Sequence, residues 1–153
     1  MARDFRFFIS DDNRTTWYEI SGVNTWSFTI DSNEEDTSTF DNGACGSAMY
    51  TQRTGGVSLE GFYLVDSVTG TRDTGQNKLE VAATKVGYEA YRDFNVIAQP
   101  LVSGVRGTNL GGFMFTGQVA LGDQGGSTTD VEPFSVDLIF EGKPTGSGVM
   151  NIF

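Results

Sequence analysis

The stretch Thr25–Tyr50, "TWSFTIDSNEEDTSTFDNGACGSAMY", joins a strongly patterned segment to a long polar one. In its first part, Trp26, Phe28 and Ile30 alternate with small polar residues, which is typical of a strand with one buried face. An acidic run follows, and the only cysteine of the chain, Cys45, lies just after it. The polar part can be interpreted as a metal site, as the surroundings of a nucleophile, or as an arm that contacts another protein.

The same period of two recurs along the chain outside this stretch. It predicts further strands, each with apolar residues on one face. Pro100 should end the longest of them or place it at a sheet edge, because proline cannot donate to a strand ladder. These strands are expected at residues 5–9, 17–20, 57–65, 91–102, 113–121 and 134–141.

One segment has a helical period instead. In "DTGQNKLEVAATKVG" the apolar residues fall at i, i+3, i+4 and i+7, which predicts one amphipathic helix over residues 74–86. Asp73 or Thr74 is suited to the N-cap and Gly87 to the stop. The expected buried stripe is Leu79, Ala82, Ala83 and Val86.

Composition favours one mainly β domain over residues 1–153. The chain has 12 Phe, 5 Tyr and 2 Trp for a core, and its 20 Gly suit frequent turns. Its net charge of −10 repels nucleic acid at long range. No apolar run approaches the roughly 18 residues of a membrane span, so no membrane anchor is expected. Residues 144–153 are polar and glycine-bearing at first, which predicts a flexible C-terminal tail.

The residues for catalysis or cofactor binding are missing. The chain has no histidine, so a Ser–His–Asp or Cys–His arrangement is impossible and Cys45 has no evident activating base. A calcium loop of EF-hand spacing starting at Asp31 would need Gly and Glu where the chain has Asp36 and Asn42. A calcium site of another kind and a pair of catalytic carboxylates remain open alternatives. No catalytic residue, metal ligand or cofactor is predicted.

The interpretation that remains for the acidic run is a long loop over residues 31–48 that acts as an arm. Loops longer than about 12 residues are uncommon in a compact domain unless they are functional or disordered. Only Phe40 within it could anchor it to the domain's own core. The residues predicted to contact another subunit are Asn33, Glu34, Glu35, Asp36, Thr37, Thr39, Phe40, Asp41 and Met49.

The order of these segments resembles the major tail (tail tube) proteins of long-tailed bacteriophages. The resemblance covers residues 3–144 and rests on "ISGVNTWSFTID", the acidic "EEDTSTFDNG", "VSLEGFYLVD", the short helix and the closing "FSVDLIFEGKP". It implies a β-sandwich or barrel-like fold with one flanking helix. It also implies hexameric rings, stacked into a hollow tube around a tape-measure protein, through which DNA passes.

Further expectations follow from the same resemblance. The chain would be made in the host cytoplasm and be located in the virion tail, with tail terminator and tail-tip proteins at the tube ends. The arm, residues 33–49, would reach a neighbouring subunit. An acidic channel would not grip phosphates, and Glu60, Asp93 and Asp137 are lumen candidates because each lies inside a predicted strand. Two alternatives stay open: a capsid decoration protein, or a carbohydrate-binding β-sandwich using Trp17, Tyr18 and Trp26.

Overall fold

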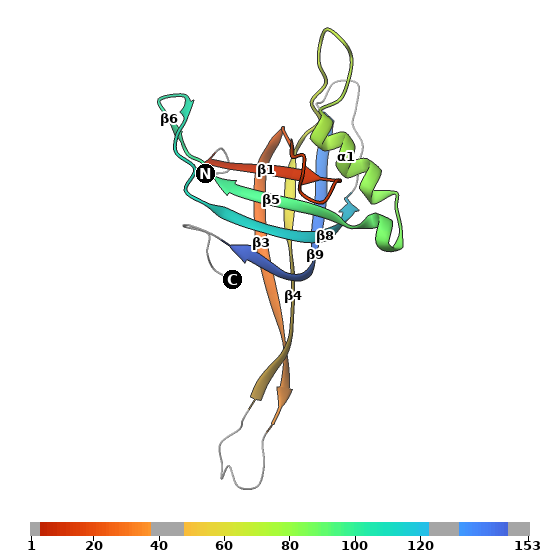
Figure 1. Ribbon diagram of the computed structural model, residues 1–153, viewed down its shortest axis with the longest axis vertical. Helices are drawn as coiled ribbons and strands as arrows, with labels where there is room; N and C mark the ends of the chain where they lie inside the picture. The colour runs from red at the N-terminus through yellow and green to blue at the C-terminus, as the bar shows by residue number, and fades with distance from the viewer. Residues whose placement is uncertain (1–3, 38–47, 123–131, 147–153) are drawn as a thin grey trace.

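The computed structural model describes residues 4–37, 48–122 and 132–146, and these form a mainly β structure with one short α-helix (Figure 1). The mainly β class predicted from the sequence is therefore confirmed. The elements are β1 (Phe5–Ser10), β2 (Tyr18–Glu19), β3 (Val23–Asp36), β4 (Ala48–Phe62), α1 (Thr74–Ala83), the 3-10 helix η3 (Gly87–Ala90), β5 (Arg92–Ala98), β6 (Leu101–Val102), β7 (Val105–Arg106), β8 (Gly112–Leu121) and β9 (Pro133–Gly146).

Seven strands form one antiparallel sheet in the order β2-β1-β5-β8-β9-β4-β3. The sheet curls until its two sides meet. The ring of Trp26 on the edge strand β3 lies 4.7 Å from that of Phe5 and 5.6 Å from that of Phe7, both on β1 at the other side of the sheet. Figure 1 shows β1, β5 and β8 running across β3 and β4. A barrel-like arrangement is the result.

The core fills the inside of this curl, and it follows the period of two. Phe94 of β5 stacks on Phe115 of β8 with ring centroids 5.1 Å apart, and Phe28 of β3 meets Phe113 at 5.4 Å. Residues of one parity on each strand are buried, while their neighbours face outward. The buried apolar residues of this cluster are Phe7, Ile9, Ile20, Val57, Leu59, Tyr63, Leu79, Phe94, Val96, Phe113, Phe115, Phe134, Val136 and Leu138.

Helix α1 begins as predicted and ends earlier than predicted. Asp73 is the N-cap, since its carboxylate accepts a hydrogen bond from the backbone N–H of Gln76. The helix ends at Ala83 because the next N–H groups bond three residues back, that of Thr84 to the carbonyl of Val81. The prediction that Val86 lies in the buried stripe is therefore wrong, and its side chain is 84% exposed.

A fully buried glutamine fastens α1 to the sheet. The side-chain oxygen of Gln76 accepts from the N–H of Leu64 at 3.0 Å. Its Nε2 donates to the carbonyls of Ser21 and Phe62 at 2.7 and 2.9 Å. The helix approaches so closely that a Cβ on Gly75 would lie 2.1 Å from the carbonyl oxygen of Glu19. Gln76 thus satisfies backbone groups at the points where the chain enters β3 and leaves β4.

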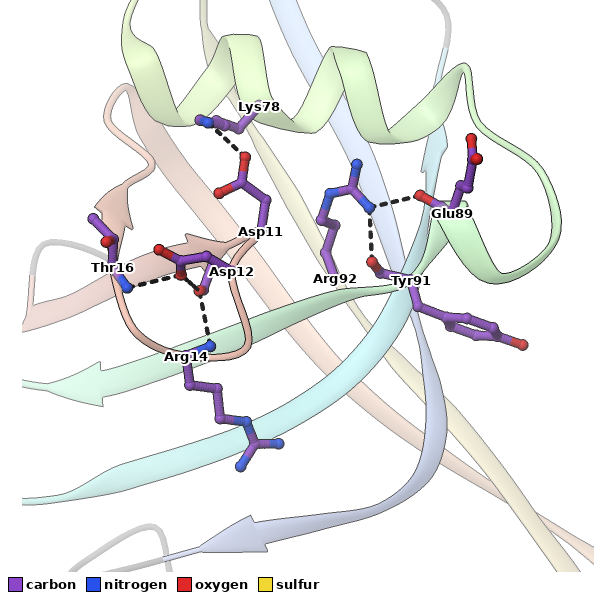
Figure 2. A network of polar contacts seen from close by, with 9 residues as sticks. Asp11, Asp12, Arg14, Thr16, Lys78, Glu89, Tyr91 and Arg92 are labelled. Atoms are coloured by element: carbon purple, nitrogen blue, oxygen red, sulfur yellow. Dashed lines mark hydrogen bonds and ion pairs between the residues drawn. The ribbon is translucent and has the colours of Figure 1, made fainter.

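The turn between β1 and β2 is held by one ion pair to the same helix and by hydrogen bonds within the turn (Figure 2). Lys78 on α1 forms an ion pair with Asp11, with 2.5 Å between nitrogen and oxygen. Asp12 accepts a hydrogen bond from the backbone N–H of Thr16 and another from the Ser10 hydroxyl, each at 2.8 Å. These bonds, the one from the Thr16 backbone first, lower the pKa of Asp12 to about 2.

The predicted loop over residues 31–48 starts too early, while its C-terminal bound agrees with the structure to within one residue. β3 continues to Asp36 and β4 starts at Ala48, and the two are paired as far as Asp36 with Ala48. The "DSNEED" segment lacks an apolar face, but the backbone groups on one side of it pair with β4 all the same. At the other end of the chain, residues 144–146 of the expected flexible tail belong to β9, where Thr145 pairs with Met114.

Candidate functional site

The arm is the outer part of the β3–β4 hairpin, residues 30–37 and 48–55. β9 accompanies β4 only between Phe62 and Gly56, where Gly56 pairs with Ile139. Beyond that point, in the part of the hairpin that the structure describes, β3 and β4 pair only with each other. Figure 1 shows the hairpin leaving the curled sheet and pointing away from it.

The side chains along the arm are exposed. Asn33, Glu34, Glu35 and Asp36 lie in β3, and Thr37 directly follows it. Across from them, Met49 is 61% and Tyr50 60% exposed. Thr39, Phe40 and Asp41 of the predicted contact set, and Cys45 with them, lie outside the described residues. The prediction of an arm is thus consistent with a hairpin whose outer side chains have little cover in their own chain.

A groove of about 570 Å³ lies where the arm leaves the body. We call it the elbow groove. On the arm side it is lined by Ile30 and Arg53, and on the β9 side by Phe140, Lys143 and Pro144. The sequence pattern does not predict this groove. The local signal was the "EGKP" segment, since a glycine and a proline two residues apart inside a strand indicate a bulge.

The face of the sheet that points away from the core carries the three lumen candidates. Glu60 on β4 is paired with Ser135 of β9 and Thr25 of β3. Asp137 is opposite Ser58, whose hydroxyl donates to its carboxylate at 2.5 Å. Both carboxylates are on exposed residues, so two of the three candidates lie close together on one outward face.

Asp93 differs from the other two candidates. Its side chain is only 16% exposed. One carboxylate oxygen accepts from the hydroxyl of Thr116 at 2.6 Å and from Nε of Arg14 at 3.1 Å. Its charge is therefore largely compensated within the chain, and it contributes less negative field than Glu60 or Asp137.

Four strands of the body carry no cation in their body segments, whereas β1 and β5 carry Arg6 and Arg92. Residues 23–30 of β3, 55–62 of β4, 112–121 of β8 and 133–142 of β9 contain no Lys or Arg, and they include the acids Glu60, Asp137 and Glu141. Small polar side chains such as Ser27, Ser58 and Ser135 occupy several outward positions among them, beside exposed apolar side chains such as Phe62 and Ile139. This face would repel a phosphate backbone, because it offers no positive side chain to neutralise one.

A metal site, a membrane-spanning helix and an aromatic platform for sugars have little support in the described part of the chain. There, no group of three His, Cys, Asp or Glu side chains could hold a metal ion. None of the helices described is long and apolar enough to cross a membrane. Of the aromatics proposed as a sugar platform, Trp26 packs on Phe5 and Phe7, and Tyr18 lies under the Lys78 ammonium, 4.6 Å from its ring centroid. Two of these three rings are thus already engaged within the fold.

Comparison with solved structures identifies the fold. The chain is similar to one in the tail of an empty gene transfer agent (GTA) particle with C6 symmetry, with a TM-score of 0.62 and 12% identity, over 97% of this chain and 98% of that one. It is also similar to a chain of the sheath–tube complex of the PVC extracellular contractile injection system in the extended state, with a TM-score of 0.60 and 11% identity over 97% and 91%.

A third similarity is to the anti-feeding prophage (AFP) baseplate, with a TM-score of 0.59 and 12% identity over 97% of this chain and 95% of that one. No protein-family model and no curated sequence matches the chain. The structural similarities extend over almost the whole length, so the fold is that of tail and tube proteins of phage-like particles.

Proposed function

We propose that this chain is the structural subunit of a phage-like tail tube, in which copies form six-membered rings that stack into a hollow tube. The observation that carries the proposal is the arm, a paired hairpin that leaves its own body with exposed apolar and acidic side chains. In a monomer the arm buries little of its side-chain surface, whereas a neighbouring subunit can cover it.

The similarity in fold supports an assembly with six-fold symmetry, in which neighbouring copies would cover the arm. The similar chain with the TM-score of 0.62 belongs to a tail with C6 symmetry. In addition, β3 is an edge strand of the sheet, so one side of its backbone is available for pairing with another chain.

We infer further that the outward face of residues 23–30, 55–62, 112–121 and 133–142, which carries no Lys or Arg, lines the channel and that DNA passes along it. Glu60 and Asp137 lie on this face. Repeated around each ring and from ring to ring, their charges repel phosphate, and the absence of Lys and Arg removes counterion release as a source of binding. A polymer that must slide needs both conditions.

We also propose partners at the tube's interior and ends, from the resemblance to tail tube proteins. A tape-measure protein would occupy the tube before DNA does, and tail terminator and tail-tip proteins would bind its two ends. The chain would then be located in the tail of a phage-like particle, as a structural component without catalytic activity.

Assembly is tested by sedimentation velocity and negative-stain electron microscopy of the purified chain over increasing concentration. We expect rings of six or tubes with a regular axial repeat. A chain that remains monomeric up to millimolar concentration, at both low and high salt, would contradict the proposal.

The channel is tested with assembled tubes and a short fluorescent DNA duplex at low salt. We expect no change in anisotropy, and Glu60→Lys with Asp137→Lys should create binding that weakens steeply as salt is added. Salt-dependent binding by the unmodified tube would show that the channel has been assigned the wrong face.

A further inference from the structure

The loop between β4 and α1, residues 64–72, is exposed along its whole length and is held in shape by its own hydrogen bonds. Oδ1 of Asp66 accepts from the backbone N–H groups of Val68 at 2.7 Å and Thr69 at 3.0 Å. The side chain of Val68 is 91% exposed and that of Val65 55%. The loop thus presents two apolar side chains on a backbone that loses little freedom when it binds a partner.

The end of the molecule that carries this loop is negatively charged. The hydrogen bonds to the Asp66 carboxylate, that from the Thr69 backbone first, lower the pKa of Asp66, so this group stays ionised. Its other oxygen, Oδ2, accepts no hydrogen bond within the described part of the chain. Arg72, at the base of the loop, forms ion pairs with Glu80 and Glu132. These three carboxylates and one guanidinium have a formal charge of −2.

The opposite end of α1 carries a surface of complementary character. We call Lys85, Val86, Tyr88 and Tyr91 the helix-end surface. Val86 is 84% and Tyr88 95% exposed, and the rings of Tyr88 and Tyr91 lie 6.3 Å apart. Exposed large apolar side chains that occur together are typical of an interaction site.

The charge at the helix-end surface is positive. Lys85 is exposed and forms no ion pair among the described residues. Arg92, next to Tyr91, donates to the backbone carbonyls of Glu89 and Tyr91 at 2.6 and 2.8 Å, and no described carboxylate pairs with it (Figure 2). Together with the exposed carboxylate of Glu89, these two cations give a formal charge of +1.

The loop cannot reach the helix-end surface of its own chain. The ten residues of α1 lie between the two, a length of about 15 Å at 1.5 Å per residue. The loop is closed at its base, where Val65 pairs with Arg72, and Figure 1 shows it extending away from the far end of α1. A contact between these two surfaces therefore requires two copies.

We propose that the helix-end surface binds the β4–α1 loop of a second copy, with Asp66 at Lys85 and Val68 against Val86 and Tyr88. The inference rests on the proposed function, because it names a contact between copies, and this contact does not involve the arm. Both surfaces expose apolar side chains, one beside negative and the other beside positive charge. Copies that repel each other through a net charge of −10 need such local pairing to associate.

The contact is heterologous, because the loop and the helix-end surface are different surfaces of the same chain. Every copy offers one of each, so the association continues until a ring closes or a filament grows. The two surfaces lie at opposite ends of α1, which gives the association a direction.

Two other projections are candidate occupants of the helix-end surface. The β6–β7 hairpin exposes Val102 and Val105, but it adds a cation, Arg106, to a surface that is already positive. The arm carries Glu35 and the exposed Tyr50. The charge of the hairpin disfavours it, and cross-linking distinguishes the loop from both.

Cross-linking tests the contact directly. In a Cys45→Ser background, a tagged protein carrying Tyr88→Cys is mixed with one carrying Val68→Cys, and the mixture is oxidised under assembly conditions. A disulfide forms only where two Cα atoms approach within about 7 Å, so we expect a yield about ten-fold above that with Val102→Cys, an exposed valine of the β6–β7 hairpin. Equal yields for the two valine positions would overturn the proposal. A higher yield with Tyr50→Cys would overturn the loop as the occupant in favour of the arm.

Charge removal gives a second, independent readout. Asp66→Asn keeps an oxygen acceptor for the turn, and Lys85→Gln removes the partner. Each should raise the concentration needed for assembly about three-fold, as is reasonable for an exposed ion pair, and the double variant should be no worse than either. Lys143→Gln, which removes an exposed cation of β9, should leave that concentration unchanged. Circular dichroism shows whether each variant is folded.

The sign of the Asp66→Asn effect is informative by itself. This substitution makes the chain less negative, so a general repulsion between copies would decrease and assembly would become easier. A local contact with Lys85 predicts the opposite. Easier or unchanged assembly by Asp66→Asn would overturn the proposal.

The outcomes separate this inference from the proposed function. Tubes that form without the Val68–Tyr88 cross-link overturn the loop contact and leave the tube subunit standing. The cross-link in a chain that forms only small oligomers supports the loop contact and contradicts the tube.

Discussion

The body and the arm of this molecule are built from the same two strands, yet they differ in what stabilises them. Leu59, in the body part of β4, is fully buried, whereas Tyr50, nine residues earlier in the same strand, is 60% exposed. In the body each strand has the core beneath it, and in the arm the strands have only each other. Backbone hydrogen bonds alone thus extend the hairpin, but their net contribution to the stability of a monomer is small.

This difference separates the requirements of folding from those of assembly. Substitutions of buried residues in the body should lower the free energy of unfolding and affect assembly only through that loss. Substitutions in the arm should leave unfolding almost unchanged and act on assembly.

Leu59→Ala should have the largest effect. Its side chain is completely buried, and deleting buried methyl groups leaves a cavity, so we expect a loss of about 3 kcal/mol in the free energy of unfolding. Urea denaturation followed by fluorescence measures it. A loss below about 1 kcal/mol would mean that β4 is not held by the core as described.

Gln76→Leu should cost about 2 kcal/mol. It removes the partner of the Leu64 N–H and of the Ser21 and Phe62 carbonyls, which are then left unsatisfied in the interior. Asn77→Leu, at the next and exposed position of α1, is the matched control and should change stability little. Equal effects of the two would contradict the fastening of α1 by Gln76.

Gly142→Ala should cost about 1 kcal/mol, because φ at this position is +76° and a Cβ disfavours that conformation. No atom lies within 4 Å of a Cβ built there, so the cost comes from the backbone and not from a clash. Gly142→Asn should be milder, since asparagine tolerates the left-handed region. Thermal unfolding compares the two.

Asp12→Asn should have a smaller effect that depends on pH. The pKa of Asp12 is lowered to about 2 in the folded chain, below its ordinary value near 4, so its charged form stabilises the fold above pH 4. That contribution is lost as the pH falls from about 4 to 2. The urea midpoint of Asp12→Asn should lie below that of the unmodified chain at pH 7, and the difference should shrink as the pH is lowered from 4 to 2.

The control for this pH dependence comes from the arm. Asp31 is an exposed arm carboxylate on β3. Asp31→Asn should leave the urea midpoint unchanged at both pH values. A pH-dependent difference for Asp31→Asn of the same size would show that the acid sensitivity does not arise at the β1–β2 turn.

Tyr50→Ser should have the smallest effect on unfolding, within about 0.5 kcal/mol, since surface substitutions rarely exceed this. Its effect on assembly should be the opposite, with a clear rise in the concentration at which tubes form. Sedimentation velocity measures assembly, and urea denaturation measures stability in the same preparation. Normal assembly by this variant would remove Tyr50 from the contact that the arm makes.

Sequence reasoning predicted the parts that a buried core determines. The alternation of Phe134, Val136 and Leu138, and the Asp73 cap of α1, are visible as local patterns, and the structure confirms them. The arm's strands were missed because the core imposes no alternation on side chains that are exposed on both faces. Arg53 and Lys143 are 90 residues apart in the sequence, and only the bulge at Gly142 brings them to one groove.

The most direct measurement replaces residues 31–54 with an Asn-Gly turn between Ile30 and Gly55, which are paired in the hairpin. Urea denaturation and sedimentation velocity are then run on this variant beside the unmodified chain. We expect a cooperative unfolding transition with a similar midpoint, together with complete loss of rings and tubes. A variant that still assembles, or one that no longer folds, would contradict the division between a body that folds and an arm that assembles.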